Sequence, residues 1–168
     1  MWFEEFVWRI KVFKGLFTAV LVVIADQLTK FFVDTQFIVN KPLVVNEYFN
    51  LVKVWNTGVS FSMFNNHGKA GAILLSLFAL LVVAFLLHWM YKELDKTKII
   101  ALGLIVGGAL GNVIDRIRFG AVLDFLDFHY KSSHWPAFNV ADSFICLGAF
   151  ILIILAIKDS RKKGLDEV

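Results

Sequence analysis

Four long apolar runs limit what this chain can fold into more than any other feature of its sequence. They cover about residues 13–33, 70–90, 99–115 and 140–157. A helix needs roughly 17–25 mostly apolar residues to cross the hydrocarbon core of a bilayer. Apolar residues make up 58% of the chain, against about 45–50% in ordinary soluble domains. The sequence therefore predicts an α-helical polytopic membrane protein with four transmembrane helices, folded as a single domain over residues 1–168.

Lysine and arginine are unevenly distributed between the segments that flank these runs. The chain ends and the short connection 91–98 carry Arg9, Lys11, Lys14, Lys92, Lys96, Lys98, Lys158, Arg161, Lys162 and Lys163. The much longer segments 34–69 and 116–139 carry only six basic residues. Since basic residues favour the cytoplasmic side, we expect both termini in the cytoplasm and the long segments outside it. Glu4 and Glu5 precede the first run and no A-x-A-like site follows it, so no cleaved signal peptide is expected.

The two long connections contain strand-like patterns. Apolar positions alternate around 43–45 and 51–54, and a turn-forming cluster follows at 65–68. Short strands there predict a small extracytoplasmic β-rich platform. Residues 120–130 are compatible with a strand or with a partly unwound helix entrance, and both interpretations stay open.

When the four runs alternate in direction, nearly all polar positions near the bilayer fall in one leaflet. They are Asp26, Lys30, Asn56, Asn112, Asp115, Arg116, Asp124, Asp127, Asn139 and Asp142, and Gly58 lies beside Asn56 on the same outer connection. Charged side chains at membrane depth are costly, which makes them candidates for a functional site facing the bundle interior.

Several of these positions also have a purely structural explanation. Asp26 and Lys30 are four residues apart on one helical face, so a structural ion pair explains them as well as a substrate contact does. The segment 112–116 can mark a helix end anchored among head groups, although its arginine suits a carboxylate or a phosphate. The spacing of Gly107 and Gly111 favours close helix packing.

Asp124 and Asp142 form the most distinctive pair of acidic residues. Neither has a cationic neighbour in the local sequence, and both are flanked by apolar residues. Desolvation raises the pKa of a carboxyl group, and two close carboxyl groups do not both ionise easily. One proton shared between them would allow one to act as general base on water and the other as general acid. The alternative is that Asp142 only caps the fourth helix and Asp124 is a solvated loop residue.

Other chemistries find little support in the sequence. No serine lies in a nucleophile elbow, and no H-E-x-x-H motif occurs. Cys146 is the only cysteine and the four histidines are scattered, so no metal site is expected. No cluster of basic residues on a polar surface indicates a nucleic-acid partner.

Two other functional classes remain in competition with a peptidase. Intramembrane Asp and Lys also mark the ion paths of proton-coupled transporters or channels. Confinement of the charges to one leaflet and the absence of an inverted repeat count against that class. The other is a non-catalytic membrane subunit that binds a lipid-modified partner.

Five motifs in order connect the chain to a known family. They are Asp26–Lys30 (DQLTK), Asn56–Phe61 (NTGVSF), Gly107–Arg116 (GGALGNVIDR), Val122–Phe125 (VLDF) and Phe138–Asp142 (FNVAD). With these motifs, about residues 15–158 resemble the signal peptidase II family of bacterial lipoprotein signal peptidases.

The resemblance implies an intramembrane aspartic endopeptidase of the bacterial plasma (inner) membrane with a small extracytoplasmic β-rich cradle. Such a hydrolase cleaves the signal peptide from diacylglyceryl-modified prolipoproteins immediately before the lipid-modified cysteine. The family pattern makes Asp124 and Asp142 the catalytic pair. It makes the following residues substrate-binding or site-supporting: Asp26, Lys30, Asn56, Gly58, Asn112, Asp115, Arg116 and Asn139.

The resemblance also carries expectations about partners and location. The family uses no metal or organic cofactor, and globomycin-type cyclic peptides occupy its substrate cleft. We expect contact with membrane lipids, an active site near the outer (periplasmic) face, and a monomeric enzyme.

Overall fold

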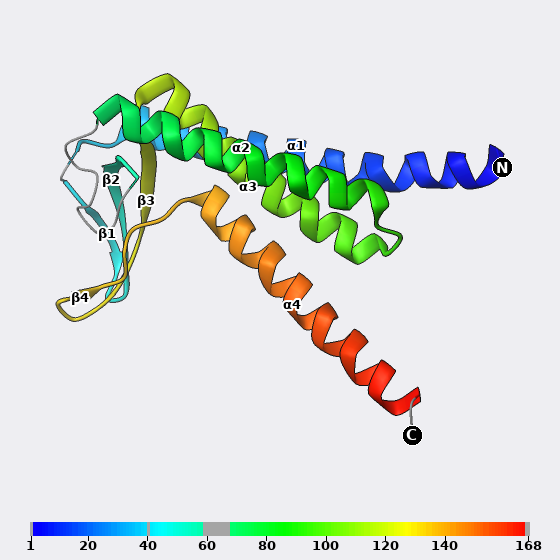
Figure 1. The fold of residues 1–168 in the computed structure, drawn as a ribbon. Coiled ribbons are helices and arrows are strands. Elements are labelled where there is room, and N and C mark those ends of the chain that lie inside the picture. Colours follow the sequence, from blue (N-terminus) through cyan, green and yellow to red (C-terminus); the bar gives the residue numbers. More distant parts are fainter. Residues whose placement is uncertain (1, 40, 59–67, 167–168) are drawn as a thin grey trace.

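The computed structural model describes residues 2–39, 41–58 and 68–166, which form four long helices and one four-stranded antiparallel sheet (Figure 1). The helices are α1 (Trp2–Gln36), α2 (Gly68–Lys92), α3 (Lys96–Phe119) and α4 (Val140–Asp166). The strands are β1 (Leu43–Asn46), β2 (Phe49–Asn56), β3 (Val122–Tyr130) and β4 (Ser133–His134). All four helices are long and apolar enough to cross a membrane, which confirms the predicted fold class. Motif residues 59–61 and most of the turn expected at 65–68 lie outside the described residues.

The third helix is longer than its apolar run. Asp95 caps its start by accepting hydrogen bonds from the backbone N–H groups of Thr97 and Lys98. Its end is set by Gly120, whose φ of 74° is the left-handed conformation that glycine adopts easily. Asp115 and Arg116 therefore lie inside α3, close to its end, and not beyond the helix.

α3 is the central helix of the bundle, since it packs against α1, α2 and α4 and is the most buried of the four. Glycines let the other backbones approach it closely. A Cβ atom at Gly107 would lie 2.6 Å from the carbonyl oxygen of Ala19 in α1. A Cβ atom at Gly108 would collide with the carbonyl oxygen of Ala141 in α4. The packing role predicted for this glycine segment is therefore confirmed.

The sheet has the strand order β1-β2-β3-β4 and joins the ends of α1 and α3 to the start of α4. Residues 120–130, for which a strand or an unwound helix was expected, contain a nine-residue strand. In the β2–β3 pairing Phe49 lies opposite Phe128 and Asn56 lies opposite Val122. Leu123, which is buried with Phe125 and Val33, fastens this sheet to the end of α1.

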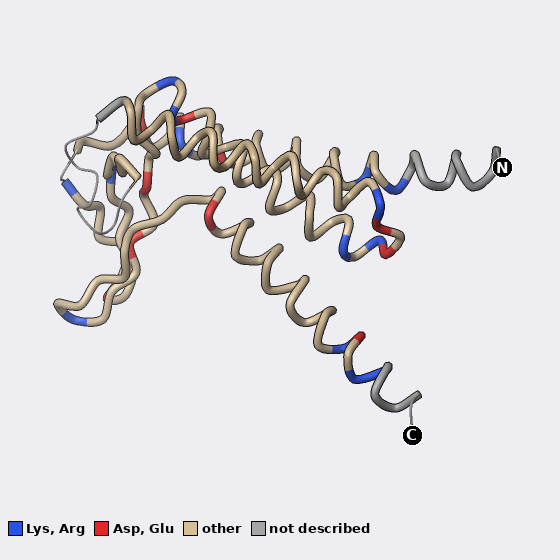
Figure 2. Tube along the Cα trace, in the orientation of Figure 1, with Lys and Arg blue, Asp and Glu red and all other residues tan. Residues whose placement is uncertain are grey.

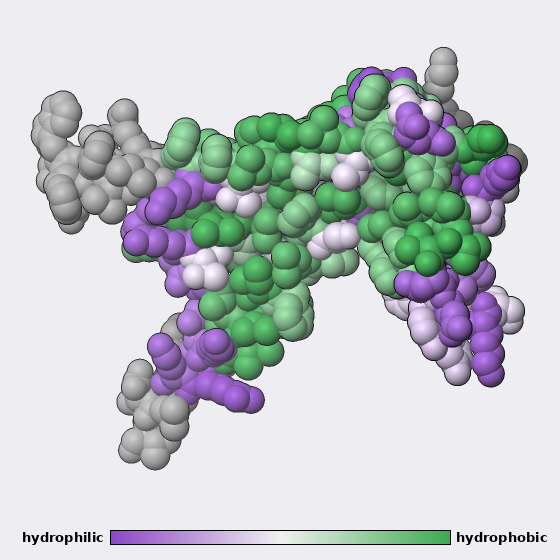
Figure 3. Space-filling view, turned by 180° about the vertical axis from the view of Figure 1, so that it is seen from behind, coloured by the Kyte–Doolittle hydropathy of each residue, from purple (hydrophilic) through white to green (hydrophobic). Residues whose placement is uncertain are grey.

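Charge and hydropathy follow the pattern of a membrane protein. The middle parts of the helices carry almost no charged residues, and Lys and Arg gather towards the helix ends (Figure 2). Apolar surface covers the helices (Figure 3), and large side chains such as Phe78, Leu81 and Phe150 are exposed on them. Such faces suit contact with lipid chains.

The close approach of α1 and α3 generates a prediction about stability. Gly107→Ala should lower the free energy of unfolding by about 1–3 kcal/mol, because overpacking of a tight interface costs about that amount. Gly71→Ala is the matched control, since a Cβ atom there meets nothing within 4 Å. Chemical unfolding in detergent, followed by helical circular dichroism, measures both variants. If Gly107→Ala and Gly71→Ala unfolded with equal free energies, the close contact of Gly107 with α1 would not be needed for stability.

Candidate active site

Side chains from separate parts of the chain meet where α1, α3 and α4 adjoin the sheet. Hydrogen bonds and ion pairs join nine of the ten predicted site residues into one network. The nine are Asp26, Lys30, Asn56, Gly58, Asn112, Asp115, Asp124, Asn139 and Asp142. The tenth, Arg116, interacts electrostatically with Asp115, Asp124 and Asp142. The structure thus brings together all ten residues.

Two asparagine amides connect the carboxyl groups of Asp124 and Asp142. Asn139 donates from Nδ2 to Asp124 Oδ1 at 2.7 Å and to Asn112 Oδ1 at 3.2 Å. Asn112 donates from Nδ2 to Asp142 Oδ1 at 2.8 Å. The two acids therefore sit at the ends of one short chain of amide hydrogen bonds, although they come from β3 and α4.

The first turn of α4 has a reciprocal cap. The N–H of Asp142 donates to Asn139 Oδ1 at 2.9 Å, and the N–H of Asn139 donates to Asp142 Oδ2 at 3.4 Å. This pattern satisfies two otherwise unpaired N–H groups at a helix start. The helix-capping role considered for Asp142 is thus present, but its other oxygen belongs to the amide chain.

Lys30 is the only cation inside the hydrogen-bonded network of described residues. Its Nζ lies 2.8 Å from Asp26 Oδ2, 2.9 Å from Asp115 Oδ2 and 2.9 Å from Asn112 Oδ1. An ammonium group has three N–H donors, so these contacts use all of them. The three charged side chains are almost completely buried. Such a cluster is stable only when every charge is paired.

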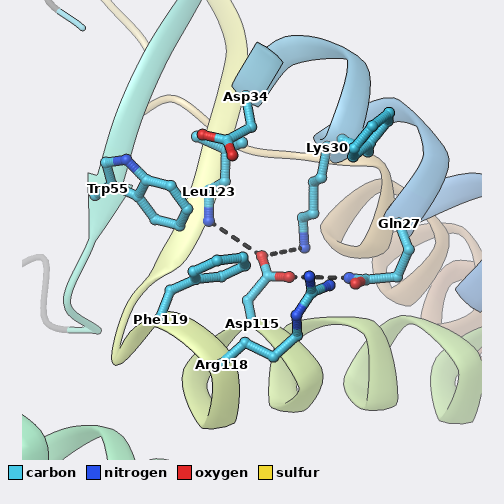
Figure 4. A pocket seen from close by; sticks show the side chains of 9 residues that line it. Gln27, Lys30, Asp34, Trp55, Asp115, Arg118, Phe119 and Leu123 are labelled. Atoms are coloured by element: carbon cyan, nitrogen blue, oxygen red, sulfur yellow. Dashed lines mark hydrogen bonds and ion pairs between the residues drawn. The ribbon is translucent and has the colours of Figure 1, made fainter.

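Asp115 ties α3 to the strand that carries Asp124. Its Oδ2 accepts a hydrogen bond from the N–H of Leu123 at 3.2 Å, and its Oδ1 accepts from Gln27 Nε2 at 2.9 Å (Figure 4). The side chains in Figure 4 line a cavity of about 50 Å³, which is room for a few water molecules. Gln27 was not predicted as a site residue. Its place in the DQLTK motif was the available signal.

Asp26 reaches the start of α4 from the middle of α1. Its Oδ1 accepts from the N–H of Ala141 at 2.9 Å, and its other oxygen binds Lys30. A carboxylate at a helix N-terminus is favoured by the helix dipole. Gly111 leaves the room that this carboxylate needs, because a Cβ atom there would lie 2.6 Å from Asp26 Oδ2.

The end of β2 closes the other side of the site. Asn56 donates from Nδ2 to Asp124 Oδ2 at 2.9 Å, and its Oδ1 accepts from the N–H of Gly58 at 2.8 Å. Gly58 has a φ of 105°, and a Cβ atom there would collide with Leu75. Arg116 Nε lies nearby, buried and without a hydrogen-bond partner among the described residues.

Asp124 has an unusual proton affinity. Its pKa is raised to about 6, chiefly by burial. The hydrogen bond from Asn56 lowers this pKa, and the nearby charge of Asp142 raises it. A carboxyl group of this kind exchanges its proton close to neutral pH.

Asp127 belongs to a separate group of polar side chains further along the sheet. It accepts hydrogen bonds from Asn50 Nδ2 at 2.9 Å and interacts with His134 Nδ1 at 2.9 Å. Burial raises its pKa, but these two contacts outweigh burial and hold the pKa below its usual value. Within residues 2–39, 41–58 and 68–166, no three His, Cys, Asp or Glu side chains are placed to hold a metal ion.

The family model described as "Signal peptidase (SPase) II" matches residues 18–158. A lipoprotein signal peptidase of Aeromonas hydrophila is 40% identical over 153 residues, which cover 89% of this chain and 92% of the relative. One of Shewanella loihica is 38% identical over 164 residues, 96% of each chain.

A solved structure has the same fold. A bacterial membrane enzyme solved at 2.3 Å resolution matches with a TM-score of 0.78 and 30% identity, over 89% of this chain and 90% of that one. These matches favour a peptidase over a transporter or a lipid-binding subunit. With four spanning helices and a family match over most of its length, the chain belongs to the signal peptidase II family and is a multi-pass bacterial membrane peptidase of the lipoprotein signal peptidase type.

Proposed function

We propose that this chain hydrolyses the peptide bond immediately before the diacylglyceryl-modified cysteine of a prolipoprotein, and that Asp124 and Asp142 perform the chemistry. The observation that carries the proposal is the arrangement of these two carboxyl groups: the amide of Asn112 holds Asp142, the amide of Asn139 holds Asp124, and the two amides are hydrogen-bonded to each other. Two carboxyl groups within reach of each other's charge can divide the general acid and general base roles. Family membership supplies the substrate class.

In the proposed reaction Asp142 begins ionised and Asp124 begins protonated, in agreement with the raised pKa of Asp124. Asp142 takes a proton from water while the water oxygen bonds to the scissile carbonyl carbon, and Asp124 gives its proton to the carbonyl oxygen. The C–N bond then breaks as Asp142 passes its proton to the leaving amine. Asp124 recovers a proton from one hydroxyl group of the intermediate, so the pair returns to its starting state.

The other polar residues position this pair. All three N–H donors of Lys30 contact protein oxygens, so Lys30 supports Asn112 and does not bind the substrate. Asp115 accepts a hydrogen bond from the N–H of Leu123, and this contact fixes the part of β3 that carries Asp124. These contacts support the structural explanation of the Asp26–Lys30 pair over a substrate contact.

Arg116 and Gly58 are the proposed substrate contacts. Arg116 Nε has no hydrogen-bond partner among the described residues, and its guanidinium is available to a substrate carbonyl or ester oxygen. Gly58 lacks a side chain where the chain turns next to Arg116, which allows close approach of a peptide backbone.

The proposed orientation puts both termini in the cytoplasm and the sheet at the outer face. The distribution of Lys and Arg supports it. The acyl chains of the substrate can then remain in the bilayer while its peptide reaches the carboxyl pair. Globomycin-type peptides are proposed to compete for the same cleft, and the enzyme is proposed to act as a monomer that needs no cofactor.

Replacement of either acid tests the chemistry. Asp124→Asn and Asp142→Asn should each lower kcat by about 10²–10⁴-fold, since an amide cannot serve as general acid or base. Purified protein is given a diacylglyceryl-modified prolipoprotein with a chelator present, and release of the signal peptide is followed by gel shift. Asp127→Asn is the matched control on the same strand and should remain active. Near-normal turnover by either site variant would remove that residue from the mechanism.

The raised pKa of Asp124 predicts a pH profile. As pH rises through about 6, Asp124 loses its proton and the active form with one protonated and one ionised acid disappears. Above this pH, kcat/KM should therefore fall by about tenfold per pH unit. The measurement is kcat/KM between pH 5 and 8.5, with Asp127→Asn in parallel. A profile that instead rises through pH 6 to a plateau would make Asp124 the general base.

Gln27 is predicted to act through Asp115. Gln27→Leu removes the donor to Asp115 Oδ1 and should lower kcat by about tenfold, the effect of losing one hydrogen bond to a buried charge. KM should change little, because Gln27 does not contact the proposed cleft. Gln36→Leu, at an exposed position on the same helix, is the control. An unchanged kcat, or a change confined to KM, would show that Asp115 does not need this contact.

A further inference from the structure

The end of the sheet furthest from Asp124 combines exposed aromatic rings with a lysine. Two turns meet there, one between β1 and β2 and the other between β3 and β4. The N–H of His129 donates to the carbonyl oxygen of Tyr48 at 2.9 Å, and the rings of Tyr48 and Tyr130 stack at 6.3 Å. Trp135 follows on the next segment. We call Tyr48, Tyr130, Lys131 and Trp135 the sheet tip.

The tip side chains are exposed although the tip itself is firmly held. Tyr48, Tyr130 and Trp135 are 54%, 63% and 70% exposed. Beneath them, Asp127 is bound by Asn50 and His134, and the rings of His129 and His134 stack at 4.8 Å. These side-chain contacts and the backbone hydrogen bond from His129 to Tyr48 hold the tip, and the exposed rings lie outside the core of the sheet.

Lys131 adds a positive charge at the same place. It forms no ion pair with any described residue, and its ammonium lies 5.5 Å from the ring centre of Tyr130. Glu47, on the neighbouring turn, is also exposed. Zwitterionic phospholipid head groups offer a phosphate to the lysine and an ammonium to the glutamate.

The direction of the strands decides where the tip lies. Figure 1 shows that the strands run across the direction of α1, α2 and α3 at one end of the bundle. Because these helices cross the bilayer, the sheet extends along the membrane surface and not out into water. The far end of the sheet is hydrophilic or intermediate in hydropathy, unlike the helices (Figure 3). This composition suits the head-group layer better than the acyl chains.

We propose that the sheet tip lies in the head-group layer of the leaflet nearest the sheet and anchors the sheet there. Tyrosine and tryptophan favour this interface because their rings are apolar and their tips are polar. Lys131 contributes attraction to phosphate. If the proposed function is correct, anchoring at this end keeps Asp124 level with the surface where a lipid-modified cysteine must lie.

Spin labelling of the full-length protein in phosphatidylethanolamine and phosphatidylglycerol vesicles tests the proposal. The label is attached at Ser132→Cys, next to Lys131, in a Cys146→Ser background. Collision rates with oxygen and with a water-soluble nickel chelate report its depth. Phe150→Cys, on the exposed face of α4, provides the bilayer reference, and the unattached spin label in buffer provides the water reference. A ratio between the two references is expected, and a ratio equal to that of the label in buffer overturns the proposal.

A second arm identifies the anchoring residues. The triple replacement Tyr48→Ser, Tyr130→Ser and Trp135→Ser should move the Ser132→Cys label to the water value while the thermal unfolding temperature is kept. An unchanged depth in a folded triple variant would refute an anchor made by these rings. Peptidase activity is assayed separately on the Ser132→Cys protein that carries the three aromatic residues. An inactive protein whose label lies at head-group depth counts against the proposed function and not against the anchor.

Discussion

The buried ammonium of Lys30 is the interaction on which the rest of the site depends. Its partners Asp26 and Asp115 lie on α1 and α3. The second oxygen of Asp26 accepts from the Ala141 amide of α4, and the Asp115 oxygen that pairs with Lys30 also accepts from the Leu123 amide of β3. One cation therefore fixes three helices and a strand relative to one another. A charge that lost its partner there would be unsolvated, which is far more costly than an exposed ion pair would be.

Neutral amides separate this charged cluster from the pair proposed to react. Asn112 accepts from Lys30 and donates to Asp142, and Asn139 continues the chain to Asp124. An ammonium in direct contact with Asp124 would lower its pKa and remove the proton that the proposed mechanism needs. An asparagine amide fixes the position of the next side chain through its hydrogen bonds, and it transmits little of the charge of Lys30. The arrangement thus combines a rigid ionic support with a carboxyl group whose pKa is about 6.

The sheet and the glycines of α3 position different parts of the same site. Gly107 and Gly108 bring α1 and α4 close enough to α3 for short polar side chains to meet. The β2–β3 pairing places Asn56 beside Asp124, which α3 alone could not position because Gly120 ends the helix four residues earlier. Close helix packing and strand pairing therefore converge on the same few side chains.

The sequence alone determined the four spanning helices and the strands β1 and β2, because apolar run length and alternation are local properties. The family motifs also marked the set of polar residues that meet. Only the tertiary structure decided that segment 120–130 contains the strand Val122–Tyr130. Its apolar start, Val122–Phe125, suits either element, and the choice depends on pairing with β2. The tertiary structure also showed that Gln27 faces Asp115 and not lipid. Which face of a helix is buried depends on the neighbouring helices, and a single polar residue inside an apolar run cannot reveal it.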